Sequence, residues 1–463
     1  MKGFLVISAL GILAMLAEVF KFKKLLMPLT VLGILAAYAL NFMEWKQPYS
    51  ISYFDNMIAF DNVALAFSGV ILITSFFWFL LANSNYENDN HMVDHYALVL
   101  FAITGALMLT AFKNMTTLFM GVEIMSIPLY VLAASKKNNV LSNEAGFKYL
   151  IMGSFASAFL LFGIALIYGA TGSFDLNEIR TYITTNQANL PSFFYAGVVM
   201  MLIAMCFKVS AAPFHFWAPD VYQGSPTIIT ALMSTVVKTA AFAAFMRLFM
   251  VSFAGVSETW SNILVVVVAA SLVIANITAA VQTNVKRVLA YSSISHAAFM
   301  LMVILANVRS NMSVNAILYY SLAYSIGSIT AFGVLNSVTK YGNESFDEFN
   351  GLGKRNPLLA VCMTVAMLSL AGIPITAGFF AKYFVFTAMM TTSYKWLLIL
   401  AVLTSAVGVY YYFKVIIAMY FKKAENHEPV KMEMINTMVI AITAIITLAI
   451  GLAPGHVAEM FTF

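Results

Sequence analysis

Four ionisable side chains lie inside long apolar segments, where they could carry protons. They are Glu123, Lys208, Lys238 and Lys382. A charge at the centre of a bilayer costs about 2.5–3.5 kcal/mol on insertion scales, so four charges would cost on the order of 10 kcal/mol. Burial lowers the pKa of a lysine and a nearby carboxylate raises it again, so a lysine under both influences can exchange a proton near neutral pH. We therefore interpret the four residues as a candidate proton relay.

A purely structural role is the alternative for Glu123. The carboxylate could pair with one lysine and simply link two helices, but that arrangement leaves two lysines without a function. An ionisable residue inside a membrane indicates a functional site by default. The relay is therefore the preferred interpretation.

Two of the lysines lie beside a proline in the middle of an apolar segment. The first segment reads FKVSAAPFHFW, with Lys208 and Pro213, and the second reads LAGIPITAGFFAKYF, with Pro374 and Lys382. Proline removes a helix hydrogen bond, and in a membrane the freed carbonyls are tolerated only where protein or water lines the break. We expect both helices to be broken along a polar path. A packing kink without a proton role is the alternative for either helix taken alone.

The composition excludes a soluble protein. Of 463 residues, 62% are hydrophobic and 10% are charged, whereas soluble domains carry about 25% charged residues. The two cysteines, Cys206 and Cys362, form no CxxC motif and are too few for an iron–sulfur cluster, which takes about four thiolates. No two histidines have a spacing suited to haem. We expect no redox centre, cofactor or metal site in this chain.

The elements that must position these residues are membrane-spanning helices, so the predicted fold class is an all-α polytopic membrane protein. A span needs about 20 mostly apolar residues. Fourteen candidates follow: 3–20, 25–42, 62–83, 93–112, 114–134, 144–170, 193–217, 226–252, 260–281, 288–306, 312–339, 357–388, 393–420 and 433–452.

The loop charges predict the orientation. The odd-numbered loops hold 13 Lys and Arg residues, against 6 in the even-numbered loops and the N-terminus. Cytoplasmic loops are enriched in Lys and Arg. The odd loops are therefore predicted to be cytoplasmic and both termini to lie on the opposite side of the membrane.

The broken helices also suggest an internal repeat. Each is the fourth helix of a five-helix unit, and an odd number of spans makes the second unit start from the opposite face, as in transporters with inverted repeats. The predicted organisation is helices 1–3 in residues 1–90, a first repeat in 91–253, an inverted repeat in 258–421 and a last helix in 422–463.

Six sequence stretches resemble a known family, the antiporter-like subunits of respiratory NADH–quinone oxidoreductase (complex I). The stretches are FKVSAAPFHFWAPDVYQGSPT (207–227), GVEIMSIPLYVL (121–132), KYLIMGSFASAFLLFGIALIYGATG (148–172), VKTAAFAAFMRLF (237–249), VKRVLAYSSISHAAFML (285–301) and LSLAGIPITAGFFAKYFVF (368–386). Within the family the chain is most similar to the subunit N branch. It has no room for the lateral helix of subunit L, and it has Lys382 where subunit M has a glutamate.

The resemblance implies a role for each candidate residue. Glu123 matches a glutamate that modulates its lysine partner, Lys208, while Lys238 matches a connecting lysine and Lys382 the lysine on the exit side. His296 matches a histidine near the central axis, for which a satisfied structural role is about as plausible. His215 is expected to orient the broken helix, and a role in proton transfer is the less favoured alternative. Residues near helix ends are expected to be structural or to lie at proton uptake; they are Glu144, Lys148, Asp220 and Tyr222.

The function implied by the resemblance is proton translocation coupled to quinone reduction, in a translocase whose redox chemistry lies elsewhere. The resemblance also implies a bacterial inner membrane, so that both termini would be periplasmic. NADH, FMN, iron–sulfur clusters and quinone are expected in partner subunits, and other antiporter-like and small membrane subunits are the expected neighbours. Three alternatives stay open: a subunit of a related cation/proton antiporter complex, a membrane subunit of a hydrogenase or photosynthetic oxidoreductase, and a structural subunit that only bridges its neighbours.

Overall fold

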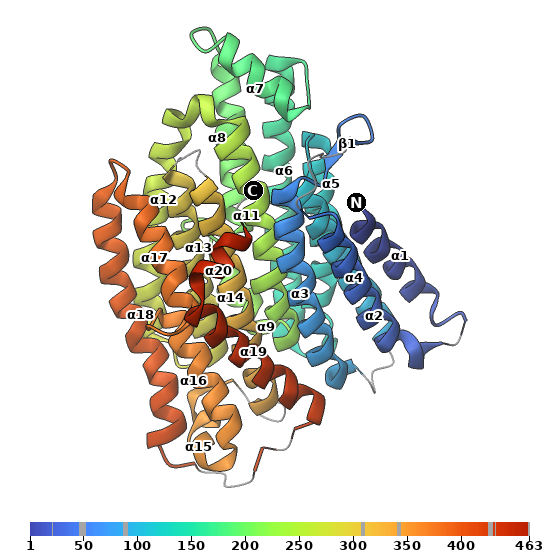
Figure 1. Ribbon diagram of the computed structural model, residues 1–463, viewed down its shortest axis with the longest axis vertical. Helices are drawn as coiled ribbons and strands as arrows, with labels where there is room; N and C mark the ends of the chain where they lie inside the picture. The colour runs from blue at the N-terminus through green and yellow to red at the C-terminus, as the bar shows by residue number, and fades with distance from the viewer. Residues whose placement is uncertain are drawn as a thin grey trace.

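The computed structural model describes residues 1–20, 22–45, 52–86, 91–306, 311–339, 344–424, 429–430 and 432–461, with only the backbone of 311–313. These parts of the chain form a bundle of helices with one short β-hairpin (Figure 1).

The N-terminal part consists of α1 (Lys2–Leu16), α2 (Leu26–Met43), the hairpin β1 (Ser52–Tyr53) and β2 (Ile58–Ala59), and α3 (Asn62–Tyr86). The next part comprises α4 (Met92–Ala111), α5 (Met115–Ala133), α6 (Val140–Thr171), α7 (Leu176–Thr185), α8 (Ser192–Lys208), α9 (Trp217–Gly224), α10 (Thr227–Leu232) and α11 (Lys238–Met246). Then follow α12 (Ser257–Val281), α13 (Val285–Leu305), α14 (Asn311–Val338), α15 (Leu352–Arg355), α16 (Pro357–Ala371), α17 (Ala377–Met390) and α18 (Lys395–Phe421). The chain ends with α19 (Met434–Leu452) and α20 (Pro454–Met460).

The all-α membrane class is confirmed. In the described chain, 11 helical segments are long and apolar enough to cross a bilayer, and four shorter apolar helices accompany them. Every predicted span falls on one of these segments or, for 357–388, on the pair α16 and α17. The count of fourteen crossings remains a prediction.

The elements that the hydropathy pattern did not predict lie between the spans. Helix α7 buries only Leu176, Ile179 and Ile183, and its other residues are polar or exposed. Such an amphipathic helix has low overall hydropathy and is missed by a search for apolar segments. The hairpin β1–β2 has two-residue strands and is too short to show an alternating pattern.

Both predicted breaks are present, and they are wider than proline kinks. Helix α8 ends at Lys208 and α9 begins at Trp217, while α16 ends at Ala371 and α17 begins at Ala377. The two lysines lie on different sides of their breaks, since Lys208 ends the half-helix before the break and Lys382 lies in the half-helix after it. The two lysines therefore do not occupy matching positions within their broken helices, and the equivalence of the two helices in an inverted repeat stays a prediction.

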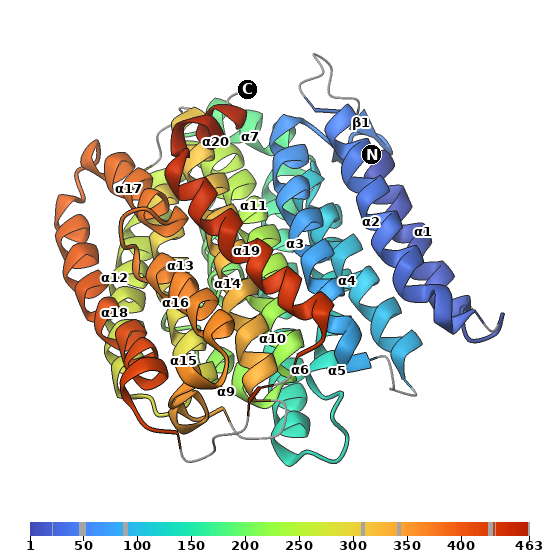
Figure 2. The same cartoon turned by 60° about the horizontal axis from the view of Figure 1, so that its bottom comes forward.

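Each of the two predicted repeats contains one contact of the same kind, and the two contacts lie at opposite ends of the bundle. Asn114 caps the start of α5 and pairs as an isolated antiparallel bridge with Asp175, and Asn284 caps the start of α13 and pairs in the same way with Ser345. The first contact lies at the end that carries α7 and the second at the end that carries α15 (Figure 2). Both chain termini also point toward the α7 end (Figure 2).

The most buried helices occupy the centre of the bundle. All residues in the apolar stretch of segment 227–252, which carries Lys238, are buried. In the apolar stretches of α13 and α14, 94% of the residues are buried. Helices α6 and α18 lie at the outside of the bundle, since only 28% and 33% of the residues in their apolar stretches are buried. The segments with candidate relay residues therefore include the best shielded parts of the fold.

Candidate functional site

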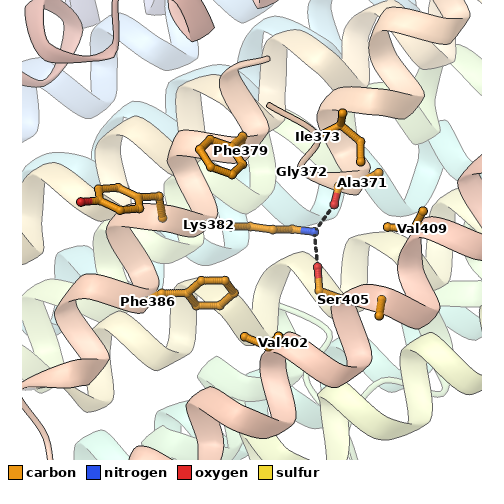
Figure 3. A pocket seen from close by; sticks show the side chains of 11 residues that line it. Ala371, Gly372, Ile373, Phe379, Lys382, Phe386, Val402, Ser405 and Val409 are labelled. Atoms are coloured by element: carbon orange, nitrogen blue, oxygen red, sulfur yellow. Dashed lines mark hydrogen bonds between the residues drawn. The ribbon is translucent and has the colours of Figure 1, made fainter. Parts of the chain in front are cut away.

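Lys382 projects from α17 back toward the end of the preceding half-helix (Figure 3). Its Nζ donates to the Ala371 carbonyl oxygen at 2.7 Å and to Ser405 Oγ of α18 at 2.9 Å. The residue is 7% exposed and borders a cavity of about 250 Å³ between α16, α17 and α18. Ala371 is the last residue of α16, where helix carbonyls lack intrahelical partners and the helix dipole favours a positive charge.

Lys238 is buried in the same way at the start of α11. It is 2% exposed, and its Nζ donates to both oxygens of Ser293 on α13, at 2.6 Å to the carbonyl and 2.5 Å to the hydroxyl. A π-helical turn, Met233–Val237, comes directly before it. Such turns insert one residue into a helix and re-aim the side chains that follow.

His296 lies between the two lysines. Its Nδ1 is 2.7 Å from the Tyr320 hydroxyl of α14, and its Nε2 is 3.2 Å from the Tyr412 hydroxyl of α18. Both Lys238 and Lys382 are near enough for their charges to act on the imidazole. Both ring nitrogens of His296 therefore have a hydroxyl partner, and its role, structural or in proton transfer, stays a prediction.

Three residues of α13 form one continuous face across the centre. Ser293, His296 and Phe299 are spaced by three residues and therefore lie along one side of the helix. Ser293 binds Lys238, and the Phe299 ring centroid is 5.2 Å from Lys382 Nζ. This face joins the two lysines through side chains of a single helix.

Glu123 and Lys208 approach each other without forming an ion pair. Lys208 Nζ donates instead to Ser126 Oγ, one turn after Glu123 on α5, although the carboxylate is close enough to act on the ammonium electrostatically. The buried Oε1 of Glu123 has no hydrogen-bond partner in the described chain. A buried carboxylate oxygen without a hydrogen-bond partner is costly, so Glu123 is an exception among the buried polar groups of the described chain.

The contacts place Glu123 and Lys208 in one group, and Lys238, His296 and Lys382 in another. No hydrogen bond among the described residues joins Lys208 to Lys238. The two groups use residues at matching distances from the capping asparagines of the two candidate repeats. Glu123 of the first group lies nine residues after Asn114, and Ser293, which contacts Lys238 of the second group, lies nine residues after Asn284. Ser126 and His296 follow three residues later in each case.

The residues expected at helix ends form an ion-pair network on α6, α9 and α13. Lys148 contacts Glu144 at 2.6 Å and Asp220 at 2.8 Å, and Arg287 contacts the other oxygen of Asp220 at 2.9 Å. Tyr222, on the same half-helix as Asp220, is 1% exposed. The network therefore ties α9 to its neighbours.

His215 lies in the break between α8 and α9. It is 4% exposed, and its Nδ1 is buried without a hydrogen-bond partner in the described chain. This placement agrees with the expected location beside Pro213, and its proposed orienting role remains a prediction.

Arg247 lies near the end of the predicted span 226–252. It is nevertheless buried, with 7% of its surface exposed. It makes two hydrogen bonds to Asp61, at 3.0 and 2.5 Å, and a third to the Thr110 carbonyl. Asp61 precedes α3, so hydropathy gave no sign that the two residues meet.

Sequence reasoning missed the neutral partners of the relay. They are Ser126, Ser293, Ser405, Tyr320 and Tyr412. Helical spacing could have found two of them, since Ser126 lies three residues after Glu123 and Ser293 three residues before His296. In the described part of the chain, no three His, Cys, Asp or Glu side chains gather as a metal site.

Comparisons with known proteins point to one family. A sequence profile described as "NADH:quinone oxidoreductase/Mrp antiporter, TM" matches residues 113–408. NADH-quinone oxidoreductase subunit N of Flavobacterium psychrophilum is 43% identical over 462 residues, which cover 99% of this chain and 100% of that protein. Respiratory complex I from Thermus thermophilus with bound aureothin contains a chain with a TM-score of 0.85 and 31% identity, covering 99% of this chain and 98% of that one. The archaeal membrane-bound sulfane sulfur reductase contains a chain with a TM-score of 0.86 and 25% identity, covering 99% and 96%.

Proposed function

The chain belongs to the NADH:quinone oxidoreductase/Mrp antiporter family, and from this premise we propose that it is the subunit N-type membrane component of an NADH–quinone oxidoreductase. The motif-based resemblance is confirmed by the full-length relatives, which carry the subunit N name. Assignment to a separate cation/proton antiporter complex is not favoured, because these relatives match over nearly the whole chain.

We further propose that this subunit moves protons along Glu123, Lys208, Lys238, His296 and Lys382. The observation that carries this proposal is the bonding of Lys238 and Lys382. Both ammonium groups are buried and donate to serine hydroxyls and backbone carbonyls, with no carboxylate partner among the described residues. A permanently charged lysine is costly in such a place, whereas a lysine that alternates between charged and neutral forms is suited to pass a proton.

The side chains have separate roles in this scheme. Glu123 and Lys208 form the uptake group, in which the carboxylate stabilises the charged lysine across Ser126. Lys238 and Lys382 exchange charge through the α13 face, where His296 and its two tyrosine hydroxyls offer proton donors and acceptors. A hydrated stretch would carry the proton between Lys208 and Lys238.

Electron transfer is assigned to partner subunits. This chain offers two buried, unpaired cysteines, Cys206 and Cys362, and an iron–sulfur cluster takes about four thiolates. NADH, FMN, iron–sulfur clusters and quinone would therefore be bound by other subunits of a translocase. Residues 91–253 and 258–421 are proposed as inverted repeats, supported by the matching Asn114 and Asn284 contacts.

Lys382 gives the decisive experiment. Lys382→Met removes the titrating group at similar length, so we expect proton pumping coupled to quinone reduction to fall strongly while the complex still assembles. Lys382→Arg keeps the charge but cannot release its proton usefully, because the pKa of arginine exceeds about 12. Pumping should therefore also fail in this variant.

The measurement is the proton-to-electron ratio in sealed membrane vesicles. The exposed surface residue Lys395, at the start of α18, provides a matched control: Lys395→Met should leave the ratio unchanged. A normal ratio in Lys382→Arg would contradict the relay and favour a fixed positive charge.

A further inference from the structure

The last long helix, α19, lies outside both proposed repeats and has no role in the proton path described above. It packs against α14, α16 and α17. Its C-terminal turn reaches the break between α16 and α17, on which the Lys382 site is built. This contact is made through Gly451.

Gly451 allows the backbone of α19 to lie closer to the α16–α17 break than any residue with a Cβ atom would permit. A Cβ atom at this position would collide with the Ile375 carbonyl oxygen and with the backbone of Thr376 and Ala377. The backbone of α19 therefore lies directly on the segment that connects the two half-helices. Any side chain at residue 451 must push this segment away.

The segment under Gly451 is strained. Ile375 has φ +79°, a left-handed conformation, which costs about 1–2 kcal/mol for a residue with a Cβ atom. Such strain persists only when the surroundings over-determine the conformation. The contact with Gly451 lies on the strained residue itself, so α19 is well placed to hold the break in this form.

The form of the break determines where Lys382 can reach. Gly372 ends α16 with φ +82°, and a Cβ atom there would lie 2.8 Å from Lys382 Cδ and 3.2 Å from its Nζ. The lysine chain thus crosses directly over Gly372 to the Ala371 carbonyl (Figure 3). A shift of the break would change both this path and the carbonyl at its end.

Helix α19 is also anchored to α14, whose Tyr320 contacts His296 of α13. The Tyr319 hydroxyl of α14 donates to the carbonyl of Ile450, next to Gly451, at 3.1 Å. The following residue, Tyr320, contacts His296. Helix α19 therefore contacts both α14, whose Tyr320 binds His296, and the α16–α17 break, beside which Lys382 lies.

We propose that α19 is a brace that positions Lys382, with Gly451 as the positioning residue that holds the α16–α17 break against α14. This inference rests on the proposed function of Lys382 in proton release. It assigns to the C-terminal helix a part in proton transfer without any titrating group of its own.

The test uses the complete complex in sealed vesicles with Gly451→Ala. We expect a proton-to-electron ratio lower by about twofold or more, the smallest effect typical of a residue that acts through another, and a shifted pH profile of pumping. Gly455→Ala is the matched control, because a Cβ atom there meets nothing within 4 Å; it should behave as wild type. A wild-type ratio and pH profile in Gly451→Ala would overturn the proposal.

A double variant separates this inference from the proposed function. In a Lys382→Met background, Gly451→Ala should cause no further loss of pumping, and an additive loss would show that Gly451 does not act through Lys382. If Lys382→Met itself pumps normally, the proposed function fails first. If Gly451→Ala prevents assembly, Tyr319→Phe removes only the hydroxyl that anchors Ile450. It should shift the pH profile in the same direction, and an unchanged profile would contradict the brace.

Discussion

At the scale of single residues, serine hydroxyls rather than carboxylates accept hydrogen bonds from the buried lysines. Lys208, Lys238 and Lys382 each donate to a serine, and a neutral serine stabilises an ammonium less than a carboxylate does. Lys238 and Lys382, which have no carboxylate partner among the described residues, can lose their protons without leaving an unpaired anion in the membrane. The serines are therefore suited to a site whose charge must change.

Ser126 provides the residue-scale prediction. Its hydroxyl accepts from Lys208 and donates to the Val122 carbonyl, so it fixes the ammonium one turn away from Glu123. Ser126→Ala should leave the buried ammonium without this acceptor and reduce pumping several-fold, because a lost hydrogen bond to a charged group costs about 1.5–3 kcal/mol.

The matched control is Ser154→Ala on the exposed face of α6. Proton-to-electron ratios of the two variants in sealed vesicles should differ clearly, with the Ser154 variant close to wild type. Equal ratios would mean that Ser126 has no part in positioning Lys208.

At the scale of elements, a buried ion pair joins the N-terminal helices to the first proposed repeat. Asp61 precedes α3, and Arg247 opens a π-helical turn, Arg247–Ser252, after α11. The Asp61 side chain is 26% exposed and that of Arg247 is 9% exposed. Removing one partner of such a pair costs about 3–5 kcal/mol, because the other charge is left buried and alone.

We therefore expect Asp61→Asn to destabilise the purified complex. The double change Asp61→Asn with Arg247→Met should recover much of the loss, since it also removes the buried guanidinium. Only the part-exposed Lys113, whose Nζ lies 3.6 Å from Asp61 Oδ2, then lacks its carboxylate. Thermal unfolding of wild type, both single variants and the double variant measures this coupling. Additive losses would show that the two residues stabilise the fold independently.

The same pair has a defined pH dependence. Burial favours a higher pKa for the Asp61 carboxyl, but the charge and hydrogen bonds of Arg247 outweigh it and hold the pKa below its usual value. The contribution to stability is then complete above the unfolded pKa of about 3.9 and is lost as the pH falls through the lower folded pKa. Wild type and the Asp61 variant should converge in stability only in that acid range.

The limits of sequence reasoning are clearest in these elements. Charged residues in apolar segments identified Lys238 and Lys382, and the prolines located both breaks. The width of each break and the side on which its lysine lies depend on backbone contacts from distant helices, such as Gly451 against Ile375. Serine partners were missed because serine is common in membrane helices, where it often bonds its own backbone. Asp61 and Arg247 are 186 residues apart, and no local pattern connects them.

At the scale of the whole molecule, the charges and the fold favour one orientation. Both termini and α7 lie toward one end of the bundle, and α15 lies toward the other (Figure 2). The α15 end carries Lys354 and Arg355 in α15 itself and Lys136 and Lys137 in the loop between α5 and α6. By the positive-inside rule we predict that this end faces the cytoplasm and that both termini face the periplasm.

Cysteine labelling in intact cells tests this orientation. Asn189 follows α7, Gly455 lies in α20, and Asn138 lies between α5 and α6; all three are exposed. A membrane-impermeant maleimide should label Asn189→Cys and Gly455→Cys from outside, and Asn138→Cys only after the membrane is opened. The native Cys206 and Cys362 are 0% and 4% exposed, so the background should be low. The reverse pattern would place Lys136, Lys137 and their neighbours in the periplasm and would reverse the direction in which protons enter and leave the proposed relay.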